Sequence, residues 1–153
     1  MTEKHDQYWT KILSTIEKYG WFAQIVGGTD NAPWFAYTIG LSDKNLPELL
    51  ITGLHPEKAH EFINLVGKGL VAKKFEAHDG ELLNGILTVT LMLRELNVRD
   101  IEEIMTGFIQ YAGDSTKPMK YMQVLFPDAN GKFPGDPDCN SDYAMLQSLA
   151  GLK

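Results

Sequence analysis

The sequence predicts an α+β fold: a single domain, residues 1–153, with one mixed or mainly antiparallel sheet and packed helices. Apolar residues recur at helical spacing in some segments and form short aromatic and β-branched runs in others. Clusters of the short strand-like runs are followed by segments with helical spacing, as in α+β proteins. A length of 153 residues and an apolar content of 44% suit one hydrophobic core.

Five short segments are predicted to be strands, because they are rich in aromatic and β-branched residues and are bounded by turn formers. They are residues 21–26, 34–41, 48–54, 86–94 and 119–126. The second and third are the most informative part of the chain. Each ends in Gly-Leu, and the polar stretch 42–45 between them has the composition of a turn. Their nearly continuous apolar character predicts central strands that are covered on both faces.

Four segments are predicted to be helices: residues 3–19, 56–70, 97–111 and 141–149. In the first, Tyr8, Ile12 and Ile16 form an apolar stripe at helical spacing. Gly20 follows this stripe, where a left-handed residue commonly ends a helix. Pro56 suits the first turn of the second helix, since its missing N–H is not needed there.

Four separated motifs make the chain resemble a known family. Three lie in the first half: Tyr19-Gly20-Trp21, Phe35-x-Tyr37-Thr38-x-Gly40-Leu41, and Pro47-Glu48-Leu49 with Gly53-Leu54. The fourth is Gln123-x-x-Phe126-Pro127-Asp128-x-x-Gly131-x-Phe133-Pro134. In this order they are similar to the bacterial and phage family called domain of unknown function 4262. The resemblance covers most of the chain and implies a fold, not an activity. Family members often carry an aromatic residue after the final Phe-Pro, where this chain has Gly135.

The charge balance excludes some classes of partner. The 20 acidic residues outnumber the 14 basic ones, which gives a net charge of −6. Nucleic-acid polymers and anionic membranes favour a basic face, so neither is expected as a partner, although a local basic pocket is compatible with an acidic surface. The lone Cys139 excludes an intramolecular disulfide and suits a reducing compartment. We find no apolar leader and no run long enough to span a bilayer, and therefore expect a cytoplasmic protein.

The sequence carries no recognisable catalytic or metal-binding motif. His55 and His60 are five residues apart and do not share a helix face as zinc ligands would, and His78 has no second His or Cys nearby. Asp128-x-Asn130 lacks the glycine position and the final acid of a calcium loop. A nucleophile elbow, a Walker loop and a dinucleotide fingerprint are also missing. We therefore predict no catalytic residue, no metal site and no cofactor.

A ligand site is predicted where the 34–41 strand, the turn at 47–48 and the 123–133 segment converge. Aromatic residues with polar tips can stack on a planar group, while hydroxyls, amides, carboxylates and lysines bind its edges and its charge. The predicted binding residues are Trp34, Tyr37, Thr38, Glu48, Lys73, Lys120, Gln123 and Asp128.

The same polar residues also have a structural interpretation. Thr38 and Glu48 would then satisfy the backbone of the loop after the strand, and Asp128 would cap a turn built on Asn130-Gly131. The two interpretations differ in where the hydrogen bonds of these side chains go.

These observations favour a non-enzymatic binder of a small planar anionic ligand, with a nucleotide-type signal as the leading candidate. A phage sponge that sequesters an immune nucleotide messenger is the concrete form of this hypothesis, because sequestration requires affinity and no chemistry. Two other classes stay open: a small enzyme, either a hydrolase or a flavin-type oxidoreductase, and an acidic protein-interaction or inhibitor module. A homo-oligomer is also expected, because closed symmetry is common and enlarges the binding surface of a small domain.

Overall fold

The computed structural model describes residues 2–27, 34–85, 88–97 and 120–148. These residues form six strands: β1 (Phe22–Val26), β2 (Phe35–Ile39), β3 (Glu48–Thr52), β4 (Leu82–Leu83), β5 (Leu91–Glu95) and β6 (Tyr121–Leu125). They also form three α-helices: α1 (Thr2–Tyr19), α2 (Pro56–Val71) and α5 (Ser141–Leu146). A short 3₁₀ helix, Leu41–Lys44, connects β2 to β3.

The strands belong to one mixed sheet in the order β1-β2-β3-β6-β5-β4. Neighbouring strands run antiparallel except β3 and β6, which pair in parallel. Each of the five predicted strand segments contributes to this sheet. The prediction of an α+β fold with a mixed sheet is therefore confirmed.

Two details of the strand prediction are wrong. The predicted strand 86–94 begins later, at Leu91, and the two-residue strand β4 was not predicted. Thr88, Val89 and Thr90 are β-branched, yet the structure places them outside any strand. Val89 is 42% exposed, and the Thr90 hydroxyl donates to Oδ1 of Asn84 at 2.9 Å. β-propensity reports how well a side chain fits a pleated, half-buried surface. These three side chains do not lie on such a surface, so their propensity does not place them in a strand.

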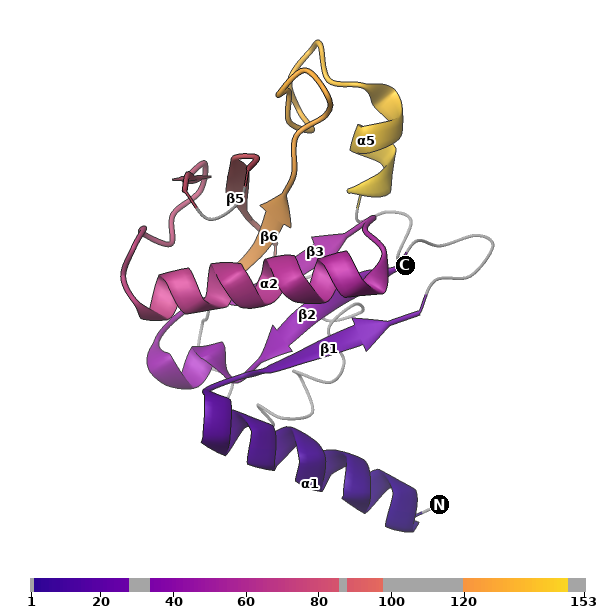
Figure 1. Ribbon diagram of the computed structural model, residues 1–153, viewed down its shortest axis with the longest axis vertical. Coiled ribbons are helices and arrows are strands. Elements are labelled where there is room, and N and C mark those ends of the chain that lie inside the picture. Colours follow the sequence, from indigo (N-terminus) through magenta and orange to yellow (C-terminus); the bar gives the residue numbers. More distant parts are fainter. Residues whose placement is uncertain (1, 28–33, 86–87, 98–119, 149–153) are drawn as a thin grey trace.

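Helix α2 covers one face of the sheet (Figure 1). Its buried residues Ala59, Ile63, Val66 and Leu70 recur at three- and four-residue intervals, so they form one stripe. The stripe packs against strand residues that point to this side: Ala36, Leu49, Ile51, Leu91, Leu93, Met122 and Val124. This cluster is the larger part of the hydrophobic core.

Helix α1 packs against the opposite face of the sheet. Its Ile12 is buried in a second cluster with Tyr37, Ile39, Leu50 and Tyr121. Because successive strand residues point to opposite faces, this cluster lies on the other side from the α2 core. β3 is buried at every position and β2 at four of five. The prediction that these strands are central and covered on both faces is confirmed.

The first two predicted helices are confirmed, and Gly20 follows α1 with φ of 102°, as a C-terminal glycine does. The predicted last helix, 141–149, ends earlier, at Leu146. The predicted helix 97–111 lies outside the described residues apart from Asn97, which is not helical. Within the described part of the chain, no helix is long and apolar enough to cross a membrane.

β1 is an edge strand of the sheet, and all five of its residues are half-buried. In Figure 1 this strand lies between α2 on one side and α1 on the other. The outer edge of β1 is therefore flanked by α1 on one face of the sheet and by α2 on the other.

Candidate functional site

The sheet brings the three segments of the predicted site side by side. β3 pairs with β2 on one side and with β6 on the other. Tyr37 lies opposite Leu50, and Leu50 lies opposite Gln123. The contacts of the polar side chains then decide what this convergence does.

The Glu48 carboxylate is buried and surrounded by hydrogen-bond donors from the loop between β2 and β3. Its Oε1 accepts from the Thr38 hydroxyl at 2.7 Å and from the N–H of Leu41 at 3.1 Å. Its Oε2 accepts from the N–H of Gly40 at 2.9 Å and from Ser42, through the N–H at 3.3 Å and the hydroxyl at 2.9 Å. These contacts are the loop contacts that the structural interpretation predicted.

Asp128 holds the loop that follows β6. Its Oδ1 accepts from the N–H groups of Asn130 and Lys132, both at 2.9 Å, and its Oδ2 from the N–H of Asn140 at 2.8 Å. The backbone hydrogen bonds, that of Asn140 first and that of Lys132 next, hold the pKa of the Asp128 carboxyl below its usual value. The predicted turn is present, with Gly131 at φ of 79° and its N–H on the Asp128 carbonyl at 3.0 Å. These contacts match the predicted capping role.

We expect Asp128→Asn to lower the melting temperature by roughly 5 °C at neutral pH, because the new amide turns N–H groups toward backbone N–H donors. The pKa of the Asp128 carboxyl is lower in the folded state than in the unfolded state. The carboxylate therefore stabilises the fold at pH values above 3.8, its ordinary pKa. This stabilisation is lost as the pH falls from 3.8 through the lowered folded-state pKa. The difference between the two proteins in thermal melts should shrink over that interval. Asp138→Asn, an exposed change in the same loop, is the control. An equal effect of the two changes would contradict the capping role.

Gln123 is fully buried and connects β6 to its surroundings. Its Oε1 accepts from the guanidinium of Arg94 on β5 at 2.6 Å, and its Nε2 donates to the carbonyl of Gln147 at 2.8 Å. Burial lowers the pKa of Arg94, and the charge of Asp79 opposes that shift. Both ends of the Gln123 amide are therefore engaged within the protein.

The other four predicted residues lie in different environments. Tyr37 is 3% exposed and belongs to the core under α1. Trp34 is 42% exposed, and its ring lies against Gly27. Lys73 is exposed just after α2, and Lys120 is exposed just before β6.

A cavity lies at the β1 edge of the sheet, away from these residues, and we call it the edge cavity. Its volume is about 670 Å³. The described residues that line it are Tyr8, Lys11, Thr15 and Tyr19 of α1; Trp21, Phe22, Ala23, Gln24 and Ile25; and His60, Asn64 and Lys68 of α2. None of the eight predicted binding residues is among them.

Helical periodicity builds the two walls of the edge cavity. On α1 the lining residues are separated by three, four and four positions, and on α2 by four and four. Residues at such intervals lie on one face of a helix. Each helix therefore presents one stripe to the cavity, and the half-buried edge strand β1 forms the floor between them.

The edge cavity is basic although the chain is acidic. Its described lining contains Lys11, Lys68 and His60 but no Asp or Glu, in a chain with 20 acidic and 14 basic residues. Among the described residues, neither lysine forms an ion pair. A concave surface lined by one sign of charge raises the local concentration of ligands of the opposite sign.

A polar chain runs from the floor of the edge cavity to its α2 wall. Nε1 of Trp21 donates to Oδ1 of Asn64 at 2.9 Å. This bond fixes the Asn64 amide so that its NH₂ group faces the ring nitrogens of His60, at 3.2 and 3.3 Å. The His60 ring therefore lies beside the Asn64 amide on the α2 wall of the cavity.

Sequence reasoning missed the edge cavity because it placed Tyr8 in the buried stripe of the first helix with Ile12. Tyr8 is 42% exposed, whereas Ile12 is buried. A signal was present: the lining residues of α1, two tyrosines with Lys11 and Thr15 between them, recur at helical spacing beside the buried stripe. The opposing wall could not be predicted, because the sequence does not show that α2 faces the same edge strand.

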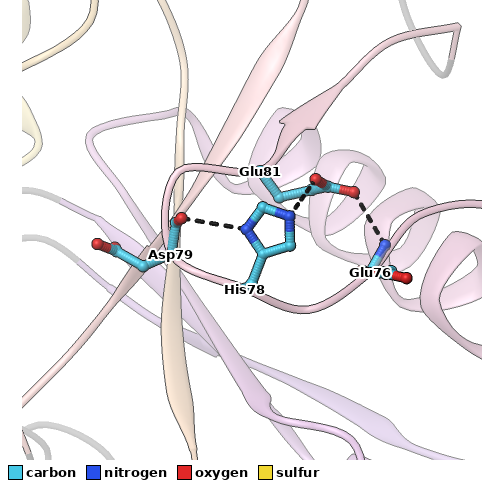
Figure 2. Close-up of polar contacts among 4 residues, drawn as sticks. All are labelled: Glu76, His78, Asp79 and Glu81. Atoms are coloured by element: carbon cyan, nitrogen blue, oxygen red, sulfur yellow. Dashed lines mark hydrogen bonds and ion pairs between the residues drawn. The ribbon is translucent and has the colours of Figure 1, made fainter.

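A second group of titratable residues lies in the loop between α2 and β4 (Figure 2). Nε2 of His78 is 2.7 Å from the Glu81 carboxylate, and its Nδ1 is 3.1 Å from the Asp79 carbonyl oxygen. The other carboxylate oxygen of Glu81 accepts from the N–H of Glu76 at 2.9 Å. These contacts tie the loop to itself. In the described part of the chain, no group of three or more His, Cys, Asp or Glu residues could hold a metal ion.

Comparison with known proteins gives a family and no activity. The family described as "Domain of unknown function (DUF4262)" matches residues 15–140. No curated protein and no solved structure matches the chain. The matched range includes β1 and the α2 wall of the edge cavity, but it begins after Tyr8 and Lys11 of the α1 wall.

Proposed function

The chain belongs to the DUF4262 family, whose description names no activity, and we propose that it is a non-enzymatic binder of a small planar anionic ligand of the nucleotide type. The binding site of this proposal is the edge cavity. The observation that carries it is the composition of the described lining: a lysine on each helical wall, a histidine, exposed tyrosines and no acidic residue. The proposal places the ligand at the edge of the sheet, away from the polar residues that hold the loops of β2, β3 and β6.

The arrangement of charge favours an anion. Lys11 on α1 and Lys68 on α2 belong to opposite walls, and His60 lies on the α2 wall with Lys68. A negative group between the walls would offset the repulsion between the two lysines and accept charge-assisted hydrogen bonds from them, which are stronger than neutral ones.

The aromatic residues favour a planar group. Tyr8 and Tyr19 line the cavity and are 42% and 65% exposed. The ring of Phe22 meets that of Tyr8 edge-on, with centroids 6.5 Å apart and an interplanar angle of 85°. Base–aromatic stacking is tolerant of base identity, because every base has a π face. A volume of about 670 Å³ lies within the range of small-molecule sites.

The biological use in this proposal is sequestration. A protein of this size that binds a nucleotide messenger tightly lowers the free concentration of that messenger by mass action and needs no reaction. A phage sponge that blunts nucleotide-based host immunity has these requirements. The edge cavity supports sequestration because it combines positive charge and aromatic stacking surface at one place.

We expect the double variant Lys11→Ala/Lys68→Ala to bind nucleotides about 100-fold more weakly than the unmodified protein, at roughly tenfold for each lysine. The measurement is isothermal titration calorimetry with a panel of adenine, guanine and uracil nucleotides. Lys58→Ala is the matched control, because Lys58 is exposed on α2, pairs with Glu61 at 3.7 Å and does not line the cavity. Its affinity should equal that of the unmodified protein.

Three outcomes would overturn parts of the proposal. Unchanged affinity in the double variant would place the ligand outside the edge cavity. A panel that neither binds nor shifts the melting temperature would remove the small-ligand function and favour a protein partner. Chromatography after incubation should recover the nucleotide unaltered, and a new product would make the protein an enzyme.

A further inference from the structure

The two exposed tyrosines of the edge cavity stand at opposite ends of the α1 stripe. Tyr8 and Tyr19 are the first and last α1 residues that line the cavity, eleven positions apart. At 1.5 Å of rise per residue, this spacing is about 16 Å along the helix axis. A single base can stack on one of these rings but cannot reach the other.

Each tyrosine ring is braced by a neighbour. Phe22 packs edge-on against Tyr8, and the Nζ atom of Lys18 lies 5.3 Å from the centroid of the Tyr19 ring. Such contacts limit the side-chain freedom that a ligand would otherwise have to remove on binding. The two rings therefore form two separate and partly ordered stacking surfaces.

Charge is available between these two surfaces. Lys11 and Thr15 separate the two tyrosines on α1, and Lys68 lines the cavity from the α2 wall. A ligand that matches this order has a planar group at each end and negative charge between them. A mononucleotide has the charge at one end.

We propose that the edge cavity binds a dinucleotide, in which two bases are joined through phosphodiester linkage. One base stacks on Tyr8 and the other on Tyr19, and the linking phosphate lies between Lys11 and Lys68. The inference rests on the proposed function, because it names the class of nucleotide for the same cavity. It adds a requirement that a mononucleotide site does not have, namely that both tyrosines contribute to the binding of one ligand.

The test compares the linear diadenylate pApA and cyclic di-AMP with AMP by calorimetry. The unmodified protein should bind at least one of the two dinucleotides at least tenfold more tightly than AMP. Tyr8→Ala and Tyr19→Ala should each weaken that dinucleotide about tenfold, and the two losses should multiply in the double variant. For AMP, which reaches one ring, only one of the two changes should have a comparable effect.

Two controls separate stacking from folding. Tyr8→Phe and Tyr19→Phe keep the rings and should retain most of the affinity. Leu13→Ala alters an α1 residue that is 50% exposed and does not line the cavity, so its affinity should not change. Melting curves of all variants verify that the fold is intact.

The outcomes for the inference and for the proposed function are distinguishable. Equal affinity for AMP and both dinucleotides, with a loss in only one tyrosine variant, would overturn the dinucleotide inference and leave a mononucleotide site. Loss of affinity in neither variant would place the ligand away from both rings and overturn the inference as well. Failure of all three compounds to bind would overturn the dinucleotide inference together with an adenine ligand.

Discussion

Glu48→Gln is expected to lower the free energy of unfolding by about 2–4 kcal/mol at neutral pH. The two carboxylate oxygens accept from three backbone N–H groups and two hydroxyls, and a carboxylate can accept at both oxygens. An amide replaces one of these acceptors by an NH₂ donor. The hydroxyl of Ser42 can rotate to accept from it, but the N–H groups of Gly40 and Leu41 cannot. At least one buried backbone donor is then left without a partner.

The stability of the unmodified protein should also depend on the ionisation of Glu48. Burial raises the pKa of this carboxyl above the ordinary 4.5, and the hydrogen bonds, that of Thr38 first, act in the opposite direction. The folded state therefore holds the proton more tightly than the unfolded state. This tighter binding of the proton stabilises the folded state below pH 4.5, and the stabilisation is lost as the pH rises through the raised pKa of the folded state. Glu48→Gln has no such titration, so the free energy of unfolding of the two proteins should differ in its dependence on pH over this interval.

Urea unfolding at several pH values measures both effects. Glu17→Gln, an exposed change on α1, is the control and should alter the free energy of unfolding by less than about 0.5 kcal/mol. A Glu48→Gln protein that kept its stability and lost nucleotide binding would contradict the loop-holding role. It would favour the ligand site at the convergence of β2, β3 and β6 instead.

Much of the fold could be predicted because its signals are local. The strands that end in Gly40 and Gly53 were recognisable from short apolar runs, and both glycines adopt positive φ, 115° and 86°. Such angles favour glycine, so the repeated Gly-Leu pattern marks the two places where the chain leaves the sheet. Helix boundaries at Gly20 and Pro56 were predictable for the same reason, since each residue has a specific backbone preference.

The candidate site could not be predicted in the same way, because its residues meet only through tertiary packing. Trp21 and Asn64, bonded across the floor and wall of the edge cavity, are 43 positions apart. The motif residues that looked functional, Glu48 and Asp128, are polar and lie in loops or at strand ends, as binding residues often do. Whether such a carboxylate faces a ligand or the backbone of its own loop depends on a few ångströms of geometry that composition does not contain.

Gly53→Ala is expected to lower the free energy of unfolding by about 3–5 kcal/mol, the largest effect among these changes. Gly53 has φ of 86°, which an alanine adopts only with strain. A Cβ atom at this position would also lie 2.6 Å from the carbonyl oxygen of Leu146 and 2.7 Å from its Cβ. The first of these atoms is backbone at the end of α5, so a change of rotamer cannot relieve the overlap.

The overlap falls where α5 is attached to the sheet. The hydroxyl of Thr52 donates to the Leu146 carbonyl at 2.9 Å, and Gln123 donates to the next carbonyl, that of Gln147. The Gln147 side chain in turn bonds the N–H and the carbonyl of Phe126, both at 2.9 Å. Displacing Leu146 to admit a methyl group would weaken these contacts together, so hydrogen exchange should accelerate at the amides of 144–148.

Gly80→Ala separates the two causes of this loss. Gly80 has nearly the same φ, 85°, but a Cβ built there meets no heavy atom within 4 Å. It should therefore show the backbone strain alone, about 1–2 kcal/mol, and leave exchange at 144–148 unchanged. The difference between the two variants is the contribution of close packing between β3 and α5. Equal losses in the two variants would mean that this end of the chain does not pack tightly on Gly53. Thr52→Val, which removes only the hydroxyl donor, should then also fail to release α5.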